Sequence, residues 1–174
     1  MLQSNFQISP VTVNNLDALR NISIQTFTET FSDYNSEENM RRYISENFSV
    51  PKLTAEFQNP GSSFYLISLK DSVIGYLKLN RGAAQTEPNE NALEIERIYV
   101  QQEFHGKKVG LCLFEKAKTI ATENHYDYIW LGVWEKNTKA IAFYRKLGFM
   151  EYDQHVFVLG SDEQTDIMMK LNLI

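Results

Sequence analysis

The spacing of apolar and polar residues along the chain predicts a mixture of helices and strands. A helical stripe of apolar side chains runs through residues 13–31, and Ser36 has the side chain of a helix N-cap ahead of a second apolar stripe. A third, short helix is expected at about residues 53–58, where Pro60 and Gly61 then break the chain. The first third of the chain is therefore expected to be mostly helical.

The remainder alternates between strands and helices. Runs rich in β-branched and aromatic residues predict strands, and two further apolar stripes, at residues 109–123 and 137–147, predict helices. The expected strands are residues 3–9, 63–69, 73–79, 93–100, 128–134, 152–159 and 166–171. If the short third helix is left out, the predicted elements follow the order β-α-α-β-β-β-α-β-α-β-β. It indicates an α/β (α+β) fold whose mixed central sheet of about six to seven strands has helices on both faces, with parallel pairing in the second half.

Composition limits the classes of function. The 174 residues fit one domain over residues 1–174, and the net charge of -5 argues against a nucleic-acid partner while it suits a cationic substrate. No apolar run is long enough to cross a membrane, so no membrane partner is expected. The single cysteine, Cys112, cannot form an internal disulfide, which favours a cytoplasmic location.

The segment 99–110 is a strand that leads through a glycine-containing turn into a helix. The free N–H groups at the start of such a helix favour an anion such as a pyrophosphate, and Lys107 and Lys108 add positive charge. The same residues also fit an ordinary strand-to-helix turn with solvated lysines. The segment matches neither the P-loop nor the dinucleotide-binding fingerprint, so ATP and dinucleotides are not expected.

Three segments carry a resemblance to a known family. They are residues 94–100 (EIERIYV), 105–110 (HGKKVG) and 137–149 (NTKAIAFYRKLGF). In this order and at this spacing they resemble the GNAT family of N-acetyltransferases, which implies that family's three-layer fold. Within the family, residues 129–137 (IWLGVWEKN) and 162–166 (DEQTD) are also similar to the PaiA-type spermidine/spermine N-acetyltransferases.

The resemblance implies acetyl-CoA as co-substrate and no metal. The three histidines also lack metal-ligand spacing. In the family, amides of a turn with the pattern Gln/Arg-x-x-Gly-x-Gly/Ala hold the pyrophosphate; here His105 occupies the first position and Lys108 replaces the first glycine. The Lys108 backbone must therefore avoid a positive φ or bear strain. The implied cofactor-binding residues are Ile98, Tyr99, Val100, His105, Gly106, Lys107, Lys108, Val109, Gly110, Leu111, Asn137 and Tyr144.

Two residues are candidates for proton transfer. The resemblance places Tyr144 beside the thioester sulfur, where a phenol could protonate the departing thiolate; packing of its helix is the competing role. Glu96 matches a position from which some polyamine acetyltransferases draw a general base acting through water. A structural ion pair with a nearby lysine or arginine would explain Glu96 equally well.

Strict alternation along residues 93–100 predicts which side chains share a face of this strand. Glu94, Glu96, Ile98 and Val100 are expected on one face, and Leu93, Ile95, Arg97 and Tyr99 on the other.

An acceptor site is expected where the first two helices overhang the sheet, as the family resemblance implies. The candidate substrate-binding residues are Glu29, Asp33, Tyr34, Glu37 and Trp134. Carboxylates interleaved with aromatic rings suit a long diamine such as spermidine or spermine, although a solvated helix face explains the same residues. A protein or peptide amine as acceptor, or a non-catalytic acetyl-CoA-binding regulator, remains an alternative. A homodimer is possible on the resemblance alone.

Overall fold

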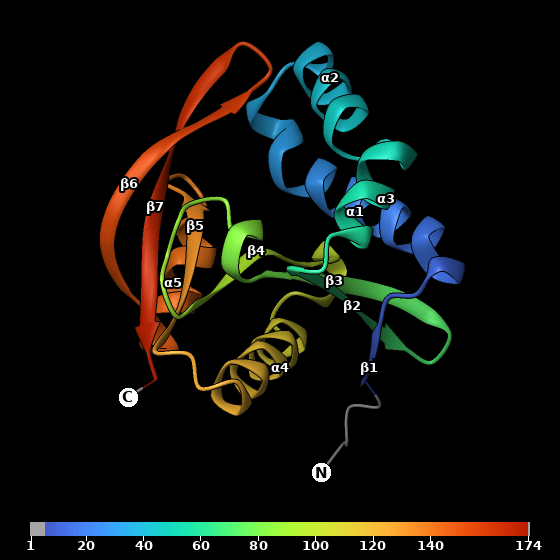
Figure 1. Ribbon diagram of the computed structural model, residues 1–174. Helices are drawn as coiled ribbons and strands as arrows, with labels where there is room; N and C mark the ends of the chain where they lie inside the picture. Colours follow the sequence, from blue (N-terminus) through green and yellow to red (C-terminus); the bar gives the residue numbers. More distant parts are fainter. Residues whose placement is uncertain (1–5, 174) are drawn as a thin grey trace.

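The computed structural model describes residues 6–173, and its centre is a seven-stranded sheet (Figure 1). The strand order is β1-β2-β3-β4-β5-β7-β6, and every neighbouring pair is antiparallel except β4 and β5. The strands are β1 (Phe6–Pro10), β2 (Ser62–Leu69), β3 (Ser72–Asn80), β4 (Ala92–Val100), β5 (Tyr128–Trp134), β6 (Met150–Leu159) and β7 (Asp162–Asn172). The predicted mixed sheet is confirmed.

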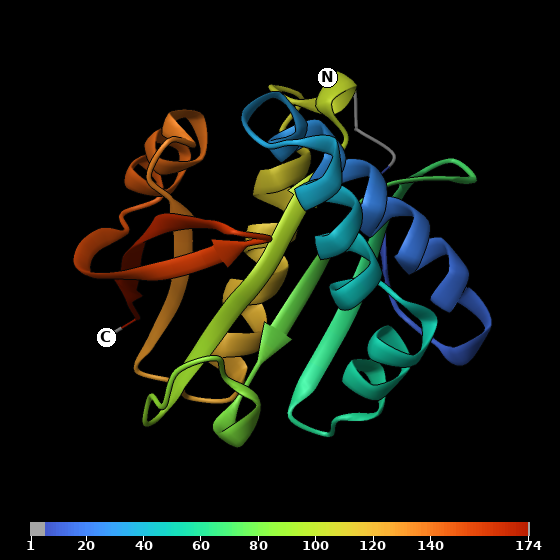
Figure 2. The ribbon, with the colours of Figure 1, turned by 90° about the horizontal axis from the view of Figure 1, so that it is seen from above.

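Five α-helices cover the two faces of this sheet. Helices α1, α2 and α3 pack on one face, and α4 and α5 pack on the other (Figures 1 and 2). Their bounds are α1 (Leu16–Phe31), α2 (Glu37–Asn47), α3 (Val50–Gln58), α4 (Val109–Glu123) and α5 (Thr138–Lys146). No helix within residues 6–173 has the length and apolar character of a membrane span.

Local sequence signals explain where these helices begin. Ser36 caps α2 as predicted, with its hydroxyl accepting a hydrogen bond from the Asn39 N–H at 3.2 Å. Helix α3 starts three residues earlier than expected because Ser49 caps it and Pro51 occupies its first turn. The opening strand, β1, begins at Phe6, and the first part of its predicted range lies outside the described residues.

Strands β4 and β5 pair over a short distance and then separate. Ala92, Leu93 and Glu94 face residues 128–130 in parallel register, and no further pairs follow. Figure 2 shows the two strands diverging toward the end of β4. Only this pair is parallel, because β7 lies between β5 and β6 and replaces the second parallel contact expected from sequence. The gap lies at the centre of the molecule.

A β-bulge in β4 changes which side chains face the core. Lys78 of β3 is opposite Arg97 and Leu79 is opposite Ile95, so Glu96 is the extra residue. The predicted strict alternation is therefore wrong beyond Ile95. Leu93, Ile95, Ile98 and Val100 belong to one core on the α4 side, whereas Tyr99 packs with the α1 side.

Candidate active site

The turn between β4 and α4 presents backbone N–H groups at a helix start. A 3-10 turn at Gln102–Phe104 precedes it, and Gly106 has a φ of 77°. Cys112 donates the first α4 hydrogen bond, to the Lys108 carbonyl at 3.1 Å, so the N–H groups of Val109 to Leu111 precede the helical ladder. This geometry suits an anion.

Lys108 occupies a left-handed conformation, with φ 66° and ψ 10°. Of the two possibilities that the sequence left for this residue, strain is therefore the one observed. A side chain in this region costs about 1–2 kcal/mol relative to the right-handed region. Glycine would avoid that cost, which explains why the family pattern has glycine here.

Two side chains brace this turn, one from within it and one from α1. The His105 ring nitrogen Nε2 lies 2.8 Å from the carbonyl oxygen of Val100, the last residue of β4. The Glu29 carboxylate on α1 accepts a hydrogen bond from the Gln102 N–H at 2.8 Å and another from the Gln25 amide at 3.1 Å. Glu29, a candidate for substrate binding, is thus engaged in holding the turn.

Helix α5 carries Asn137 and Tyr144 and lies against the start of α4, where the Phe143 ring faces Gly110. Asn137 caps the helix as predicted, and its side chain accepts a hydrogen bond from the Ala140 N–H at 3.2 Å. Tyr144 is buried between Phe143 and Phe149, and this burial raises its pKa. The phenol therefore stays protonated at neutral pH.

Tyr99 joins the two sides of the gap. Burial raises its pKa first, and the phenols of Tyr76, Tyr43 and Tyr144 and the carboxylate of Asp166 raise it further. The Tyr99 phenol therefore responds to the charges of both Tyr144 and Asp166.

Glu96 belongs to a buried ion-pair network between the sheet and α3, which we call the charge network: Glu56, Lys78, Glu96 and Arg97. Lys78 Nζ lies 2.5 Å from Glu96 and 3.1 Å from Glu56, and Arg97 lies 3.3 Å from Glu96 and 2.9 Å from Glu56. Burial would raise the pKa of Glu96, but the charges of Arg97 and Lys78 and the hydrogen bonds from Lys78 and Asn80 outweigh it and lower that pKa.

Glu94 is also fully engaged. It is 2% exposed, and its carboxylate accepts hydrogen bonds from the Asn80 amide at 3.0 Å, from the Thr86 N–H at 2.9 Å and from the Thr86 hydroxyl. Burial raises its pKa despite these donors. Glu94 connects the loop after β3 to β4 and is not directed toward an open space.

The acceptor side of the gap is walled by aromatic rings. Tyr34 lies edge-on to Trp134 with ring centroids 5.0 Å apart, and Phe31 lies 5.3 Å from the same indole. The structure thus brings together two of the predicted substrate residues, Tyr34 and Trp134. Asp33 and Glu37 are exposed beside them, while Glu29 turns toward the β4–α4 connection.

Sequence reasoning missed a second polar cluster, which we call the mouth cluster: Glu87, His155 and Asp166. His155 Nδ1 contacts the Glu87 carboxylate, and Nε2 lies 3.9 Å from Asp166 Oδ2. Burial raises the pKa of Asp166 to about 6, against the opposing charge of His155. The signal was a carboxylate at an inward position of β7, two residues before the buried Met168.

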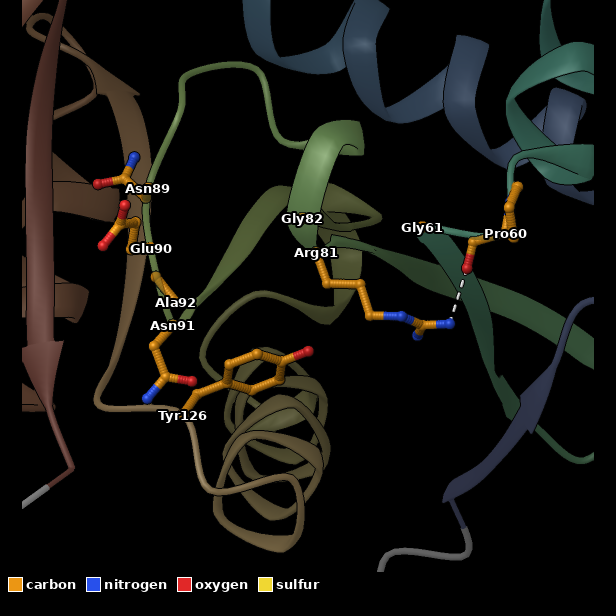
Figure 3. A pocket seen from close by; sticks show the side chains of 9 residues that line it. All are labelled: Pro60, Gly61, Arg81, Gly82, Asn89, Glu90, Asn91, Ala92 and Tyr126. Atoms are coloured by element: carbon orange, nitrogen blue, oxygen red, sulfur yellow. Dashed lines mark hydrogen bonds between the residues drawn. The ribbon is translucent and has the colours of Figure 1, made fainter.

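A hollow in the described structure lies away from these residues (Figure 3). It has a volume of about 740 Å³, and its wall includes Tyr126, which follows the C-terminal end of α4, and Arg81, whose guanidinium donates to the Pro60 carbonyl at 2.7 Å. The anion-binding turn lies at the other end of this helix, roughly 22 Å away for 15 residues. None of the predicted site residues lines the hollow.

Metal chemistry finds no support in the side-chain arrangement. Within residues 6–173, no three His, Cys, Asp or Glu side chains are placed to hold a metal ion.

Comparison with known proteins gives the family. Residues 16–149 match the model of the acetyltransferase (GNAT) family. The chain is 42% identical to an uncharacterised N-acetyltransferase of Lactobacillus delbrueckii subsp. lactis, over 88% of this chain and 89% of that protein. It is 26% identical to a spermidine N(1)-acetyltransferase of Thermoplasma acidophilum, over 86% of this chain and 91% of the relative.

A solved structure shares the fold. The PaiA N-acetyltransferase of Thermoplasma acidophilum, crystallised with coenzyme A, superposes with a TM-score of 0.78 and 23% identity, over 97% of this chain and 99% of that one. The separating strands, the amide-rich turn and the match over residues 16–149 agree with one another. The chain belongs to the acetyltransferase (GNAT) family and is an acetyl-CoA-dependent N-acetyltransferase.

Proposed function

We propose that this enzyme transfers the acetyl group directly to a primary amine of a polyamine such as spermidine or spermine. The observation that carries this proposal is the aromatic wall of Tyr34, Phe31 and Trp134 beside the carboxylate of Asp166. Aromatic faces and carboxylates are the groups that bind an alkyl-ammonium chain. The spermidine N(1)-acetyltransferase among the relatives supports the same substrate class.

The residues of the β4–α4 turn fit the cofactor's pyrophosphate. We assign this contact to the N–H groups of Gly106 and of Lys108 to Leu111, with added charge from Lys107 and Lys108, because the N–H groups of His105 and Lys107 already donate to carbonyls of the preceding 3-10 turn. Beyond Glu94 the backbone of β4 has no β5 partner, so polar groups of Ile98, Tyr99 and Val100 can hold the amide-bearing pantetheine arm, together with Asn137. The acetyl donor would then lie between the two strands.

Tyr144 is the proposed acid. The amine nitrogen forms a bond to the thioester carbonyl carbon, the carbon–sulfur bond breaks, and the thiolate takes a proton from the Tyr144 phenol. A thiol has a pKa of about 8.5, so the departing thiolate takes up a proton at neutral pH, and a phenol that is itself protonated at that pH can supply it as the carbon–sulfur bond breaks. The buried phenol of Tyr144 meets that condition.

Glu96 as a general base acting through water stays a prediction. Its ion pairs with Lys78 and Arg97 are the arrangement that the structural alternative requires, and its lowered pKa makes it a weak proton acceptor. The cytoplasmic location likewise remains a prediction from the single cysteine.

The acceptor class can be tested by thiol release from acetyl-CoA over a panel of spermidine, spermine, short diamines, amino acids and peptides. We expect the highest kcat/KM with the polyamines. Activity confined to peptides would contradict the polyamine proposal, and acetyl-CoA binding without turnover of any amine would indicate a regulator instead of an enzyme.

The role of Tyr144 can be tested with Tyr144→Phe and, as a matched control on the same helix, Phe143→Leu. We expect Tyr144→Phe to lower kcat by about 10²-fold or more while the Kd for acetyl-CoA stays unchanged, because the substitution removes only the hydroxyl group that donates the proton. Wild-type kcat in Tyr144→Phe would assign the residue to packing.

A further inference from the structure

Asp166 lies on β7 opposite Trp134, in the part of β5 that has no β4 partner. Residue 130 makes the last pair with β4, and Gly132 follows two positions later on the same face of β5. Gly132 is exposed although it is in an inner strand of the sheet, and a Cβ there would lie 3.3 Å from Asp166 Oδ2. The Asp166 carboxylate thus lies over the backbone of Gly132, in the space that a side chain there would occupy.

Strand register sets the neighbours of Asp166. It is directly opposite Trp134 on β5 and His155 on β6, and side chains of directly paired residues point to the same face. The predicted aromatic residue Trp134 and the carboxylate are therefore adjacent across two strands.

Two buried polar atoms in the residues next to Asp166 have no hydrogen-bond partner in the described protein. Within the described residues, neither Trp134 Nε1 nor Gln164 Oε1 makes a hydrogen bond, and Trp134 is only 5% exposed. Such groups are costly to bury unless a ligand or water satisfies them. Gln164 is two residues from Asp166 on β7, roughly 7 Å along the strand, which is the scale of the spacing between successive nitrogens of a polyamine.

Charge balance distinguishes this carboxylate from Glu96, which Lys78 and Arg97 hold in ion pairs. In residues 6–173, Asp166 makes no ion pair with a lysine or an arginine; its partner is His155, which Glu87 holds on the other side. Its side chain is 18% exposed and can meet a ligand. The ionisable groups that surround the mouth cluster are Tyr152 of β6, Glu94 and Tyr99 of β4, Tyr43 of α2 and Lys136 after β5.

We propose that Asp166 binds the reacting ammonium group of the acceptor and takes its proton, and that His155 and Glu87 position Asp166 for this step. The inference rests on the proposed acetylation of an amine. The ammonium gives one proton to the Asp166 carboxylate, and the neutral amine then attacks the thioester carbonyl. The second nitrogen proton leaves to solvent as the amide forms, while the thiolate is protonated by Tyr144. Asp166 then gives its proton to solvent and Tyr144 regains one, so each turnover releases one proton overall.

The positions of Asp166 and Tyr144 fit this division of work. The charges of Asp166 and Tyr144 both act on the phenol of Tyr99, which lies on β4 beyond its last pair with β5. A carboxyl group that titrates near pH 6 is also close to the pH at which a base must act, whereas Glu96 is held ionised by two cations.

Asp166→Asn tests the assignment, with Glu163→Gln on the same strand as the matched control. For the polyamine acceptor we expect kcat/KM to fall by about 10²–10⁴-fold in Asp166→Asn while the Kd for acetyl-CoA stays within twofold. The acidic limb of the wild-type pH profile near pH 6 should disappear. Wild-type kcat/KM with an unchanged acidic limb in Asp166→Asn would overturn the proposal.

The variant His155→Gln tests whether the base is Asp166 or its neighbour His155. Because the charge of His155 lowers the pKa of Asp166, removing it should move the acidic limb to higher pH without abolishing it. Loss of the limb in His155→Gln, with its retention in Asp166→Asn, would make histidine the base and overturn the assignment.

Gly132→Ala keeps the test valid if Asp166→Asn fails to fold. Its methyl group would lie 3.3 Å from Asp166 Oδ2 and 3.4 Å from Met168, so small adjustments accommodate it. We expect KM for the amine to rise several-fold at unchanged acetyl-CoA affinity, and an unchanged KM would count against an acceptor site here. A wild-type enzyme that releases no thiol with any amine would instead refute the proposed function.

Discussion

The charge network and the mouth cluster are both groups of ionisable side chains next to the same gap, but they differ in balance. The charge network has two carboxylates and two cations, each within 3.3 Å of two partners. The mouth cluster has two carboxylates and one histidine. A cluster whose charges are all paired stabilises the fold. A cluster with an excess of carboxylates has uncompensated negative charge that can bind a cationic ligand.

Tyr43 of α2 lies between the two groups and responds to both. Burial raises its pKa to about 12; Arg97 opposes this, and Glu96, Glu56 and Asp166 add to it. The two clusters are therefore neighbours in one electrostatic environment, and their different behaviour follows from local pairing more than from position.

Breaking the charge network should have the largest effect on stability. Glu96→Gln removes one of the two carboxylates that compensate Lys78, whose side chain is only 5% exposed. We expect a loss of about 3–5 kcal/mol in the free energy of unfolding, measured by urea denaturation at pH 7. Because the pKa of Glu96 is lowered, its contribution is present above the ordinary glutamate pKa and is lost as the pH falls through the folded-state value.

The same variant sharpens the comparison of function. If Glu96 is structural, Glu96→Gln protein that remains folded should keep the acidic limb of its pH profile. Loss of that limb at normal acetyl-CoA affinity would instead assign the base to the charge network.

The mouth cluster should respond to mutation in the opposite direction. Because the folded-state pKa of Asp166 is about 6, above the ordinary aspartate value of 3.8, wild-type stability decreases as the pH rises between these values. At pH 8 the free energy of unfolding of Asp166→Asn, measured by urea denaturation, should therefore exceed that of the wild type by on the order of 1–3 kcal/mol. This gain should vanish below about pH 4. A variant less stable than wild type at pH 8 would show that the carboxylate is structurally compensated.

Lys108→Gly gives the smallest expected change. Glycine removes the cost of the left-handed conformation but adds chain entropy to the unfolded state, so we expect a net gain of about 0.5–1 kcal/mol in thermal denaturation. Lys107→Gly, at a residue without positive φ, should give no gain. Equal effects of the two variants would show that the turn at Lys108 is not strained.

The sequence predicted the elements well because their apolar periodicity is local. Helix α4 and strand β5 have the expected bounds, and the Asn137 and Ser36 caps are where the pattern placed them. The bulge at Glu96 was not predicted, although two successive polar residues, Glu96 and Arg97, interrupt the alternation.

The candidate site was less accessible to sequence reasoning. Tyr144 and the turn depend on local motifs, which a single sequence displays. The mouth cluster depends on β7 lying between β5 and β6, and on the loop after β3 bringing Glu87 to His155, 68 residues away in the chain. The pairing of strands that are far apart in the chain cannot be predicted from the residues of any single segment.

The extra residue in β4 also limits how this enzyme can evolve. A substitution at Glu96 or Arg97 changes one side chain, whereas a deletion there would exchange the faces of every following position in the strand. Ile98 and Val100 would then leave the apolar core, and Tyr99 would enter it. Relatives that keep this gap should therefore tolerate substitutions in β4 far better than insertions or deletions.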